Sequence, residues 1–440
     1  MNILFISYFY PPLAGPASLR NLKTVKYLSQ KGNLIDVLTV GNLVYNYYDT
    51  GLLAESCHHR IFHIPSYDPM SLLEKLCGKN KTASKQIYHN TPERCKLFLR
   101  RLYPLDDKVL WLPKLLKEGR KLLAEGNYDL IYVSCGPFSS AVAARKLSKS
   151  FQLPYVLEMR DYWTLLKDYN LQGNYLNRLY ARNTEKKLLQ DAALIVTATK
   201  GIAEDISEQF DNHLKDKTFI LYNGHDEEDF AALTPVPKDP SQYVLSYFGA
   251  LYAKRSLKWL LKALKDLQNE NKLPQNFALR LYGNYHLETL QEIKQSGIEN
   301  LVQIIPQLSH KEALTAMLSS DALLLLMNSD SPKGTLTSKI FEYLRLKKPV
   351  LALIPANGEA AELIKECGQN YICPMESSSA IKSCIEKLFA DSEKELQFHN
   401  LADKYERKKQ VAELNQRLLS LLKERFEQRE KREKEKLGVI

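Results

Sequence analysis

Residues 334–355, GTLTSKIFEYLRLKKPVLALIP, place a polar loop, a short helix and a buried strand in succession. Thr337 and Ser338 are residue types that favour helix N-termini, so we expect a helix to begin near Ser338. The free amide groups of that helix start, with the charge of Lys339 beside them, suit a phosphate or diphosphate. Glu342, one turn further, offers acceptor oxygens for ribose hydroxyls. The stretch therefore predicts nucleotide binding, and the alternative is an ordinary loop, helix and strand of an α/β core.

A second group of basic residues follows a short apolar run in the segment FGALYAKRS, residues 248–256. Gly249 allows a tight turn after the run, and Lys254 and Arg255 come shortly after it. A guanidinium binds two phosphate oxygens in a fork, so Arg255, with Lys254 beside it, is a candidate for binding the diphosphate. The alternative for Arg255 is a solvated surface charge.

Two further candidates lie in the first half of the chain. Gly15, in YFYPPLAGPASLRN, is flanked by small residues and allows close backbone approach where open α/β sheets bind their ligands. A simple structural turn is the alternative. Asp161 follows an apolar run in the segment EMRDYW, so it is a candidate acid or base, or a ligand for a hydroxyl group. Capping of a following helix is the alternative for Asp161.

The positions of these residues depend on an alternation of short apolar runs with longer amphipathic stretches. The runs in the first half are 3–9, 34–40, 61–64, 130–133, 155–159 and 194–197, and those in the second half are 244–248, 277–282, 302–305, 322–327 and 350–354. This alternation predicts βαβ units and doubly wound parallel sheets covered on both faces. Because 440 residues exceed the size of a single core, two domains are expected.

The sequence SKIFEYL followed by KKPV resembles the nucleotide-sugar clamp of retaining glycosyltransferases of the GT-B fold, specifically the family 4 type. The resemblance covers nearly the whole chain. It implies an α/β architecture of two doubly wound, Rossmann-like domains that face each other across a cleft, with a C-terminal helix that crosses back. The expected domains are an acceptor-side domain at 1–222, a nucleotide-sugar-binding domain at 223–404, and a crossover helix with a charged tail at 405–440.

The resemblance also implies residue roles. Glu342 matches the second of two family glutamates and would contact the nucleotide ribose, whereas Gly334 occupies the place of the first. Gly249 and Arg255 match a glycine turn and a basic residue that pairs with the donor diphosphate. Gly15 matches a glycine loop near the donor phosphates. Cys135 and its neighbour occupy the place where several members carry a histidine, so no catalytic histidine is carried over.

Three segments are similar to a subgroup that makes bacterial surface polysaccharides. PLDDKVLWLP, which contains Trp111, lies on the acceptor side in that subgroup. EMRDYW contributes Arg160, Asp161 and Trp163, of which the arginine and the tryptophan are assigned to the acceptor side. NGEAAELIKECG, residues 357–368, would cap the cleft near the nucleotide.

Several absences from the sequence exclude other functions. No G-x-G or Gly-Lys-Ser/Thr sequence is present, which argues against dinucleotide-binding and P-loop proteins. No Asp-x-Asp metal motif is present, and His59 and His63 on a predicted strand would not converge on a metal. We therefore expect no metal and no cofactor. The seven cysteines include no C-x-x-C pair, which favours free thiols in a reducing cytosol.

The net charge of +10 favours polyanionic partners. Residues 93–123 interleave basic side chains with Tyr103 and Trp111, a combination that suits the headgroup layer of an anionic membrane. A solvated helix face is the alternative. The first residues lack the features of a signal peptide, and no apolar run approaches the ~20 residues of a membrane span. We therefore expect a cytoplasmic protein, with peripheral contact to the inner face of the membrane left open.

Taken together, the residues and the resemblance predict a metal-independent, retaining glycosyltransferase of surface polysaccharide biosynthesis. It would move a sugar from a nucleotide-diphosphate donor to a lipid-linked or saccharide acceptor. Lys339, Arg255 and the helix start would stabilise the leaving diphosphate. The alternatives are a nucleotide-sugar epimerase of the same fold, a binding subunit without catalysis, and a nucleic-acid binder suggested by charge alone. We expect no nucleic-acid partner.

Overall fold

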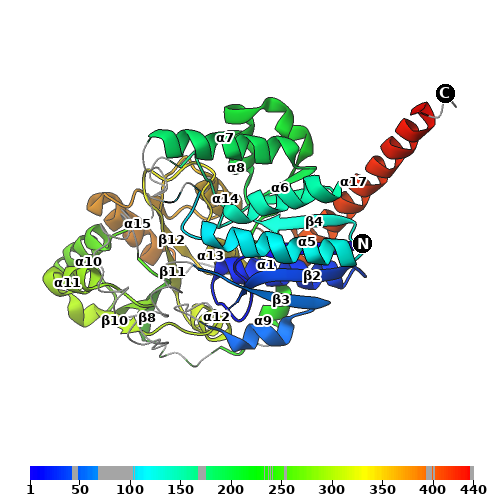
Figure 1. Cartoon of the computed structure of the whole chain (residues 1–440). Helices are drawn as coiled ribbons and strands as arrows, with labels where there is room; N and C mark the ends of the chain where they lie inside the picture. Colours follow the sequence, from blue (N-terminus) through cyan, green and yellow to red (C-terminus); the bar gives the residue numbers. More distant parts are fainter. Residues whose placement is uncertain are drawn as a thin grey trace. The chain divides into compact units, whose positions relative to one another are not determined.

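Figure 1 shows the computed structural model of the chain, which contains two compact units. It describes residues 1–41, 48–67, 103, 105–166, 175–231, 233–235, 237, 239, 241–251, 255–392, 399 and 402–436. The first unit comprises Met1–Tyr222 and Arg407–Ile440, and the second comprises Asn223–Glu406.

The first unit is built on a seven-stranded parallel sheet of order β3-β2-β1-β4-β5-β6-β7. Its strands are β1 (Asn2–Ser7), β2 (Leu34–Gly41), β3 (Arg60–Pro65), β4 (Leu130–Ser134), β5 (Tyr155–Met159), β6 (Leu194–Thr197) and β7 (Thr218–Ile220). Side chains alternate between the faces of a strand. In β1, Ile3 and Phe5 enter one core, and Leu4 and Ile6 enter the other. Both faces of the sheet are therefore covered, which explains the nearly unbroken apolar runs of its strands.

The helices of the first unit divide between these two cores. They are α1 (Pro16–Ser29), η1 (Thr50–Glu55), η2 (Val109–Trp111), α5 (Leu112–Glu125), α6 (Ser139–Phe151), α7 (Tyr175–Asp191), α8 (Lys200–Phe210), η3 (Asn212–Lys217) and α17 (Arg407–Lys436). Apolar residues of α1 and α17 join Ile3 and Phe5, whereas those of α5 to α8 join Leu4 and Ile6. The chain therefore returns to the first sheet through its last helix, as expected.

The packing of α17 follows from a stripe of apolar residues at helical spacing. Val411, Leu414, Leu418 and Leu421 are buried in the core that contains Leu22 and other residues of α1. Two hydrogen bonds at the edge of this contact fix its register. Asn33 Nδ2 donates to Asn415 Oδ1 over 2.7 Å, and the backbone N–H of Tyr222 donates to Gln410 Oε1 over 2.9 Å.

The second unit repeats the design with a six-stranded parallel sheet of order β10-β9-β8-β11-β12-β13. Its strands are β8 (Gln242–Phe248), β9 (Asn276–Tyr282), β10 (Val302–Ile305), β11 (Ala322–Leu326), β12 (Val350–Leu353) and β13 (Ile372–Cys373). Its helices are α9 (Glu227–Phe230), α10 (Lys258–Asn269), α11 (Leu287–Ser296), η4 (Glu299–Leu301), α12 (His310–Leu318), α13 (Lys339–Arg345), α14 (Glu359–Glu366), α15 (Ser378–Ala390) and α16 (Ala402–Tyr405). In both units the strand order reverses beside the first strand, so each sheet has one switch point, the edge where doubly wound folds bind ligands.

The fold class expected from the sequence is confirmed: two Rossmann-like α/β units with a C-terminal helix. All eleven apolar runs singled out above coincide with strands. Two strands were not predicted, β7 and β13, which have only three and two residues. Among the helices that the structure describes, none combines the length and the apolar character needed to cross a bilayer.

Candidate functional site

The switch point of the second unit lies between β8 and β11, which are neighbours in the sheet. Gly249 follows β8 directly, and a loop from Met327 leads from β11 to α13. The carboxyl ends of these two strands and the start of α13 therefore converge on one edge of the sheet. Most of the candidate donor-binding residues belong to these segments.

The side chain of Lys339 passes close to position 249, which favours a glycine there. Its φ of 118° lies in the region that favours glycine, and a Cβ at this position would lie 2.3 Å from Lys339 Nζ. Gly283, after β9, supports the same turn, because a Cβ there would lie 2.8 Å from the Gly249 carbonyl oxygen. The Gly249 N–H donates to the Tyr282 carbonyl over 2.8 Å. The absence of side chains at Gly249 and Gly283 thus lets the Lys339 amine reach the end of β8.

Lys339 is the electrostatic centre of this group. The pKa of its amine is lowered from 10.5 to about 8, mainly by burial and also by the nearby Arg255 charge, and Glu342 acts in the opposite direction. The amine lies 5.1 Å from the centroid of the Tyr247 ring, which attracts a cation. Two cations held near each other in a half-buried place are favourable for a ligand that brings negative charge, such as a diphosphate.

The remaining basic candidates are Arg255 and Lys254, of which the structure describes only Arg255. Arg255 is half-buried and close enough to Lys339 to affect the pKa of the lysine. Lys254 lies outside the described residues. Ser256, next to Arg255, donates to Glu292 Oε1 over 2.9 Å, which anchors this segment to α11.

Glu342 is buried, and its side chain has a partner that the sequence did not suggest. His310 Nε2 lies 2.9 Å from Glu342 Oε1, and His310 Nδ1 lies 3.9 Å from Asp229 Oδ2. The imidazole thus stands between two carboxylates. His310 is the first residue of α12, which is preceded by a capping box of Ser309 and Glu312.

The start of α13 differs from expectation in one detail. The helix begins at Lys339, but the Ser338 side chain makes no capping hydrogen bond. The reason is its backbone, because φ −59° and ψ −31° are already helical, whereas a capping residue is extended. Thr337 Oγ1 is buried and makes no hydrogen bond within the described part of the chain. The expectation that these hydroxyls cap the helix is therefore wrong.

In the first unit, Gly15 stands at the N-terminus of α1. Its φ is 116°, and its missing Cβ would meet no atom within 4 Å. The place beside it is open. The α1 helix itself is firmly held, since Arg20 Nε donates to Glu158 Oε1 over 2.6 Å and both side chains are buried.

Arg160 and Asp161 diverge at the end of β5. Arg160 turns back onto the loop after β4, where its Nε donates to the Cys135 carbonyl over 2.7 Å and its Nη2 to the Gly136 carbonyl over 2.9 Å. Burial lowers the pKa of its guanidinium. Asp161 is exposed. Residues 162–166 form turns and bends, so Asp161 does not cap a helix there.

The two tryptophans assigned to the acceptor side are both buried. Trp163 stacks on Phe138 with ring centroids 4.5 Å apart. Trp111 has no exposed surface, and its indole N–H donates to the Ile64 carbonyl over 3.2 Å. The proposal that Trp111 deepens a membrane contact is therefore wrong, because the ring fills the core beneath α5.

Within residues 93–123 the structure describes only part of the basic segment. Arg94, Lys96, Arg100 and Arg101 lie outside the described residues. In α5 the apolar residues face the core and Lys117, Arg120 and Lys121 are exposed, so the described outer surface of this helix is basic but not apolar.

Two buried acids in the first unit were not identified from the sequence. Asp106 accepts hydrogen bonds from the backbone N–H and the hydroxyl of Ser139 at the start of α6, and burial raises its pKa to about 6. Glu185 accepts a hydrogen bond from the Thr164 N–H over 3.1 Å, and burial raises its pKa to about 7. Each carboxylate fixes a loop at the carboxyl edge of the first sheet.

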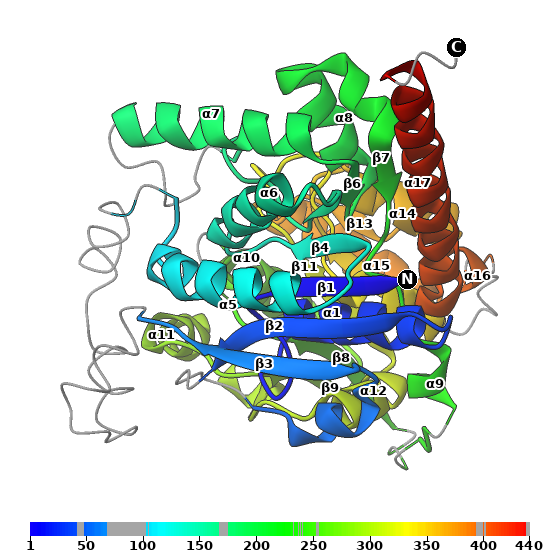
Figure 2. The same ribbon diagram turned by 45° about the vertical axis from the view of Figure 1, so that its right-hand side comes forward.

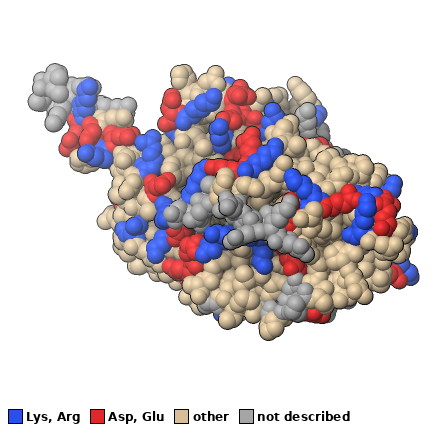
Figure 3. Space-filling view, turned by 180° about the vertical axis from the view of Figure 1, so that it is seen from behind, with Lys and Arg blue, Asp and Glu red and all other residues tan. Residues whose placement is uncertain are grey.

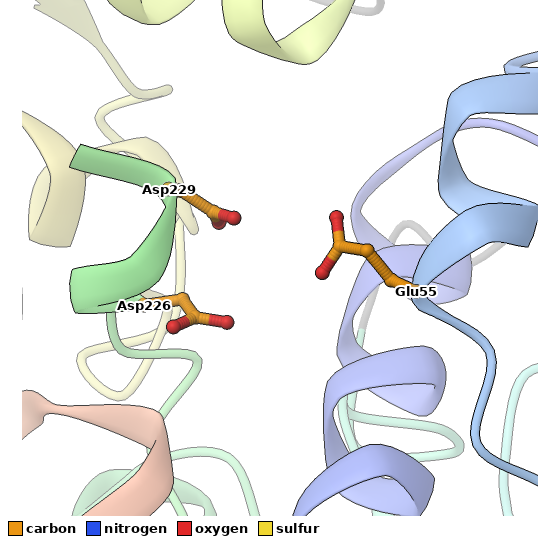
Figure 4. A group of neighbouring side chains, drawn as sticks. All are labelled: Glu55, Asp226 and Asp229. Carbon is orange, nitrogen blue, oxygen red and sulfur yellow. The ribbon is translucent and has the colours of Figure 1, made fainter. Parts of the chain in front are cut away.

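Figure 4 shows three further carboxylates, on η1 and around α9. Glu55, in the first unit, accepts hydrogen bonds from Lys23 Nζ over 2.6 Å and Lys26 Nζ over 3.1 Å. In the second unit, Asp226 caps α9 by accepting from the Glu228 N–H, and Asp229 faces His310. Each carboxylate thus has a role within its own unit.

The surface charge is mixed. On the face that Figure 3 shows, Lys and Arg side chains alternate with Asp and Glu side chains. The described residues on this face therefore form no single basic track of the kind that follows a nucleic-acid backbone.

Two doubly wound parallel-sheet units in one chain are the architecture of the GT-B class. Residues 230–405 match the family of glycosyl transferases group 1, and residues 83–224 match the glycosyl transferase 4-like domain. Each half of the chain is thus similar to a glycosyltransferase family.

Individual relatives are distant. An uncharacterized glycosyltransferase of Methanocaldococcus jannaschii is 22% identical over 254 residues, which cover 58% of this chain and 57% of that protein. Among solved structures, Anabaena HepE in complex with UDP and glucose is 17% identical with a TM-score of 0.61, over 96% of this chain and 99% of that one. A UDP-GlcNAc 2-epimerase from M. jannaschii is 13% identical with a TM-score of 0.58, over 96% and 100%. These likenesses establish the fold.

Proposed function

We propose that this protein transfers a sugar from a nucleotide-diphosphate donor to a lipid-linked or saccharide acceptor, with retention of anomeric configuration, in surface polysaccharide biosynthesis. The observation that carries the proposal is the group at the switch point of the second unit. There, Gly249 makes room for the amine of Lys339, Arg255 lies near it, and Glu342 is one helical turn away.

The chain's own residues supply the means to stabilise a leaving diphosphate. Lys339 and Arg255 provide positive charge where the bond between sugar and phosphate would break, and no covalent step of the protein is needed. Glu342 would accept hydrogen bonds from the ribose hydroxyls. We propose that transfer is independent of a metal, because the charges of Lys339 and Arg255 would stabilise the leaving diphosphate in a metal's stead.

The proposed roles of residues in the first unit rest on exposure and open space. Asp161 is exposed at the carboxyl end of β5 and is our candidate for contact with an acceptor hydroxyl. Gly15 leaves an open place at the start of α1, where a ligand backbone or phosphate can approach closely. Arg160 and Trp163 position the surrounding loops and are not proposed to contact substrate.

The test is nucleotide binding by a folded protein. We expect UDP, GDP or ADP to raise the unfolding temperature, because a ligand at 100 times its dissociation constant adds about 2.7 kcal/mol of stability. Glu342→Ala should lose most of this effect, and Glu299→Ala, at an exposed position of η4 before β10, should keep it. If Glu342→Ala is folded and binds the same nucleotide equally well, the assignment of the ribose contact is wrong.

The fold also accommodates an epimerase, since UDP-GlcNAc 2-epimerases share it. The two reactions differ in their need for an acceptor. Conversion of a nucleotide sugar to its epimer in the absence of acceptor would favour the epimerase. Dependence of diphosphate release on added acceptor would favour transfer.

A further inference from the structure

The helix α7 exposes apolar side chains on its outer side. Tyr175 is 69% exposed, Leu176 71%, Leu179 45% and Tyr180 52%. Isolated exposed apolar residues are ordinary, but four within one and a half helical turns form a contiguous patch. Figures 1 and 2 both show α7 at the outside of its unit, with its N-terminal half extending beyond α6.

The patch lies opposite the side of α7 that enters the core. At 100° per residue, the four exposed residues occupy an arc of about 140°. The buried residues are Ala181, Glu185, Leu188 and Leu189, and their arc is centred on the other side of the helix. The helix therefore has an apolar side for the core and a second apolar side that faces outward. Packing inside the unit explains only the first.

Basic residues accompany this patch. The exposed residues of α7 include Arg178, Arg182, Lys186 and Lys187, and the acid at position 185 is buried. Arg182 lies over the Phe210 ring at 4.9 Å, which holds its charge at the edge of the helix. Lys186 and Lys187 continue the outward side one to two turns after the apolar residues. Arg178 and Arg182 are exposed but lie beside the arc of the buried residues. We call Lys186, Lys187 and the four apolar residues together the outer face of α7.

We propose that the outer face of α7 docks the protein on an anionic lipid surface. Leucines exposed beside tyrosines suit the boundary between acyl chains and headgroups, where tyrosine rings are enriched, and the two lysines complement anionic headgroups. This composition is the one that α5 lacks, since the apolar residues of α5 face the core.

The charges also weigh against the other occupants of such a face. In a symmetric dimer through the outer face of α7, Lys186 and Lys187 of each copy would lie in the same interface as those of the other, which is unfavourable. A nucleic-acid strand would match the cations and stack on the tyrosines, but it gives no role to Leu176 and Leu179, which a lipid surface would bury.

The docking proposal rests on the proposed function in one respect: docking would bring the enzyme to a lipid-linked acceptor. Vesicle binding and nucleotide binding are separate measurements, so failure of one is distinguishable from failure of the other. A protein that binds UDP but ignores vesicles would overturn the docking proposal and leave the donor site intact.

The experiment is co-sedimentation of the full chain with vesicles of phosphatidylglycerol and phosphatidylcholine, at low and high salt. The first variant carries Leu176→Ser and Leu179→Ser, and the second carries Lys186→Gln and Lys187→Gln. The matched control carries Lys117→Gln and Lys121→Gln on α5, which removes two exposed charges away from any exposed apolar patch.

We expect the wild type to bind anionic vesicles, to ignore pure phosphatidylcholine, and to dissociate as salt rises. The α7 charge variant should lose about twenty-fivefold in partitioning, since each cation at an anionic surface contributes roughly fivefold. The leucine variant should also lose at least about tenfold, because its loss comes from apolar burial. The control should retain most of the binding.

Several outcomes would overturn the proposal. These are no binding by the wild type, equal binding by the leucine variant, or an equal loss in the α5 control, which would indicate diffuse charge attraction. Analytical ultracentrifugation and a labelled RNA and DNA oligonucleotide complete the test. Dimerisation or oligonucleotide binding that the leucine substitutions abolish, without vesicle binding, would assign this face to a second copy or to nucleic acid.

Discussion

Replacing Lys339 by methionine should stabilise the second unit and abolish nucleotide binding. The amine is held in a half-buried place beside Arg255, and its pKa falls from 10.5 to about 8. In the unfolded chain the lysine has its ordinary pKa. The folded state therefore binds its proton less well than the unfolded state, so the charged amine lowers the free energy of unfolding near neutral pH.

The magnitude follows from the pKa difference. From 10.5 to about 8 is a shift of about 2.5 pH units, and each unit corresponds to 1.36 kcal/mol, which gives about 3 kcal/mol. The Tyr247 ring offsets about 0.5–1 kcal/mol of this destabilisation by attracting the cation. Lys339→Met should therefore raise the free energy of unfolding by about 2 kcal/mol at pH 7.

The dependence on pH has a definite sign. Between pH 8 and pH 10.5 the unfolded chain still binds the lysine proton while the folded chain has released it. The stability contribution of this group therefore rises with pH in that window. The difference between wild type and Lys339→Met should be largest below pH 8 and should vanish above pH 10.5.

The assay is urea unfolding followed by fluorescence, in which Trp259 is the only tryptophan in the sequence of the second unit. Lys262→Met, which replaces an exposed lysine of α10, is the control and should change stability little. Calorimetric titration with UDP gives the second measurement. If Lys339→Met is less stable than the wild type at pH 7, or binds UDP with unchanged affinity, the amine is not a desolvated phosphate-binding group.

Three further predictions concern other residues. His310→Ala should lower UDP affinity about tenfold and cost about 1–3 kcal/mol of stability, because it removes the hydrogen bond from His310 to the buried Glu342 carboxylate. His310→Gln should recover part of both losses, measured by calorimetry and urea unfolding. Equal losses in the two variants would contradict the role of the hydrogen bond. Transfer activity should survive EDTA, and restoration of a chelated enzyme by Mg²⁺ or Mn²⁺ would refute metal independence. The pKa of Glu185 is raised by burial from 4.5 to about 7, so the stability of the wild type should fall as pH rises between these values. Glu185→Gln, which keeps an acceptor for Thr164, should flatten that fall in thermal unfolding measured from pH 5 to 8, and an unchanged slope would show that the carboxylate titrates elsewhere.

The order of the elements was available from the sequence because it is a local property. Each long strand is an uninterrupted apolar run, and a strand buried on both faces needs no other signal. The same is true of α17, whose apolar stripe repeats at helical spacing. β7 and β13 were missed because three and two residues carry too little periodicity to distinguish a strand from a turn.

The candidate donor residues were also recognisable, because a lysine and a glutamate at the start of one short helix are close in the chain. The residues that surround them in the structure were not recognisable from the sequence. His310 lies 32 residues before Glu342, and only the path of β11 and α13 brings them together. The Ser338 hydroxyl was expected to cap α13 from its residue type, but capping depends on a backbone angle that the residue type does not fix.

Burial was decided by the tertiary structure alone. Trp111 and Tyr180 are both aromatic residues among basic neighbours, yet Trp111 has no exposed surface and Tyr180 is 52% exposed. The sequence pointed to the first for contact with a membrane, and the structure points to the second. The reason is that exposure depends on which elements pack against a helix, and those elements come from distant parts of the chain, so no local pattern of residues determines it.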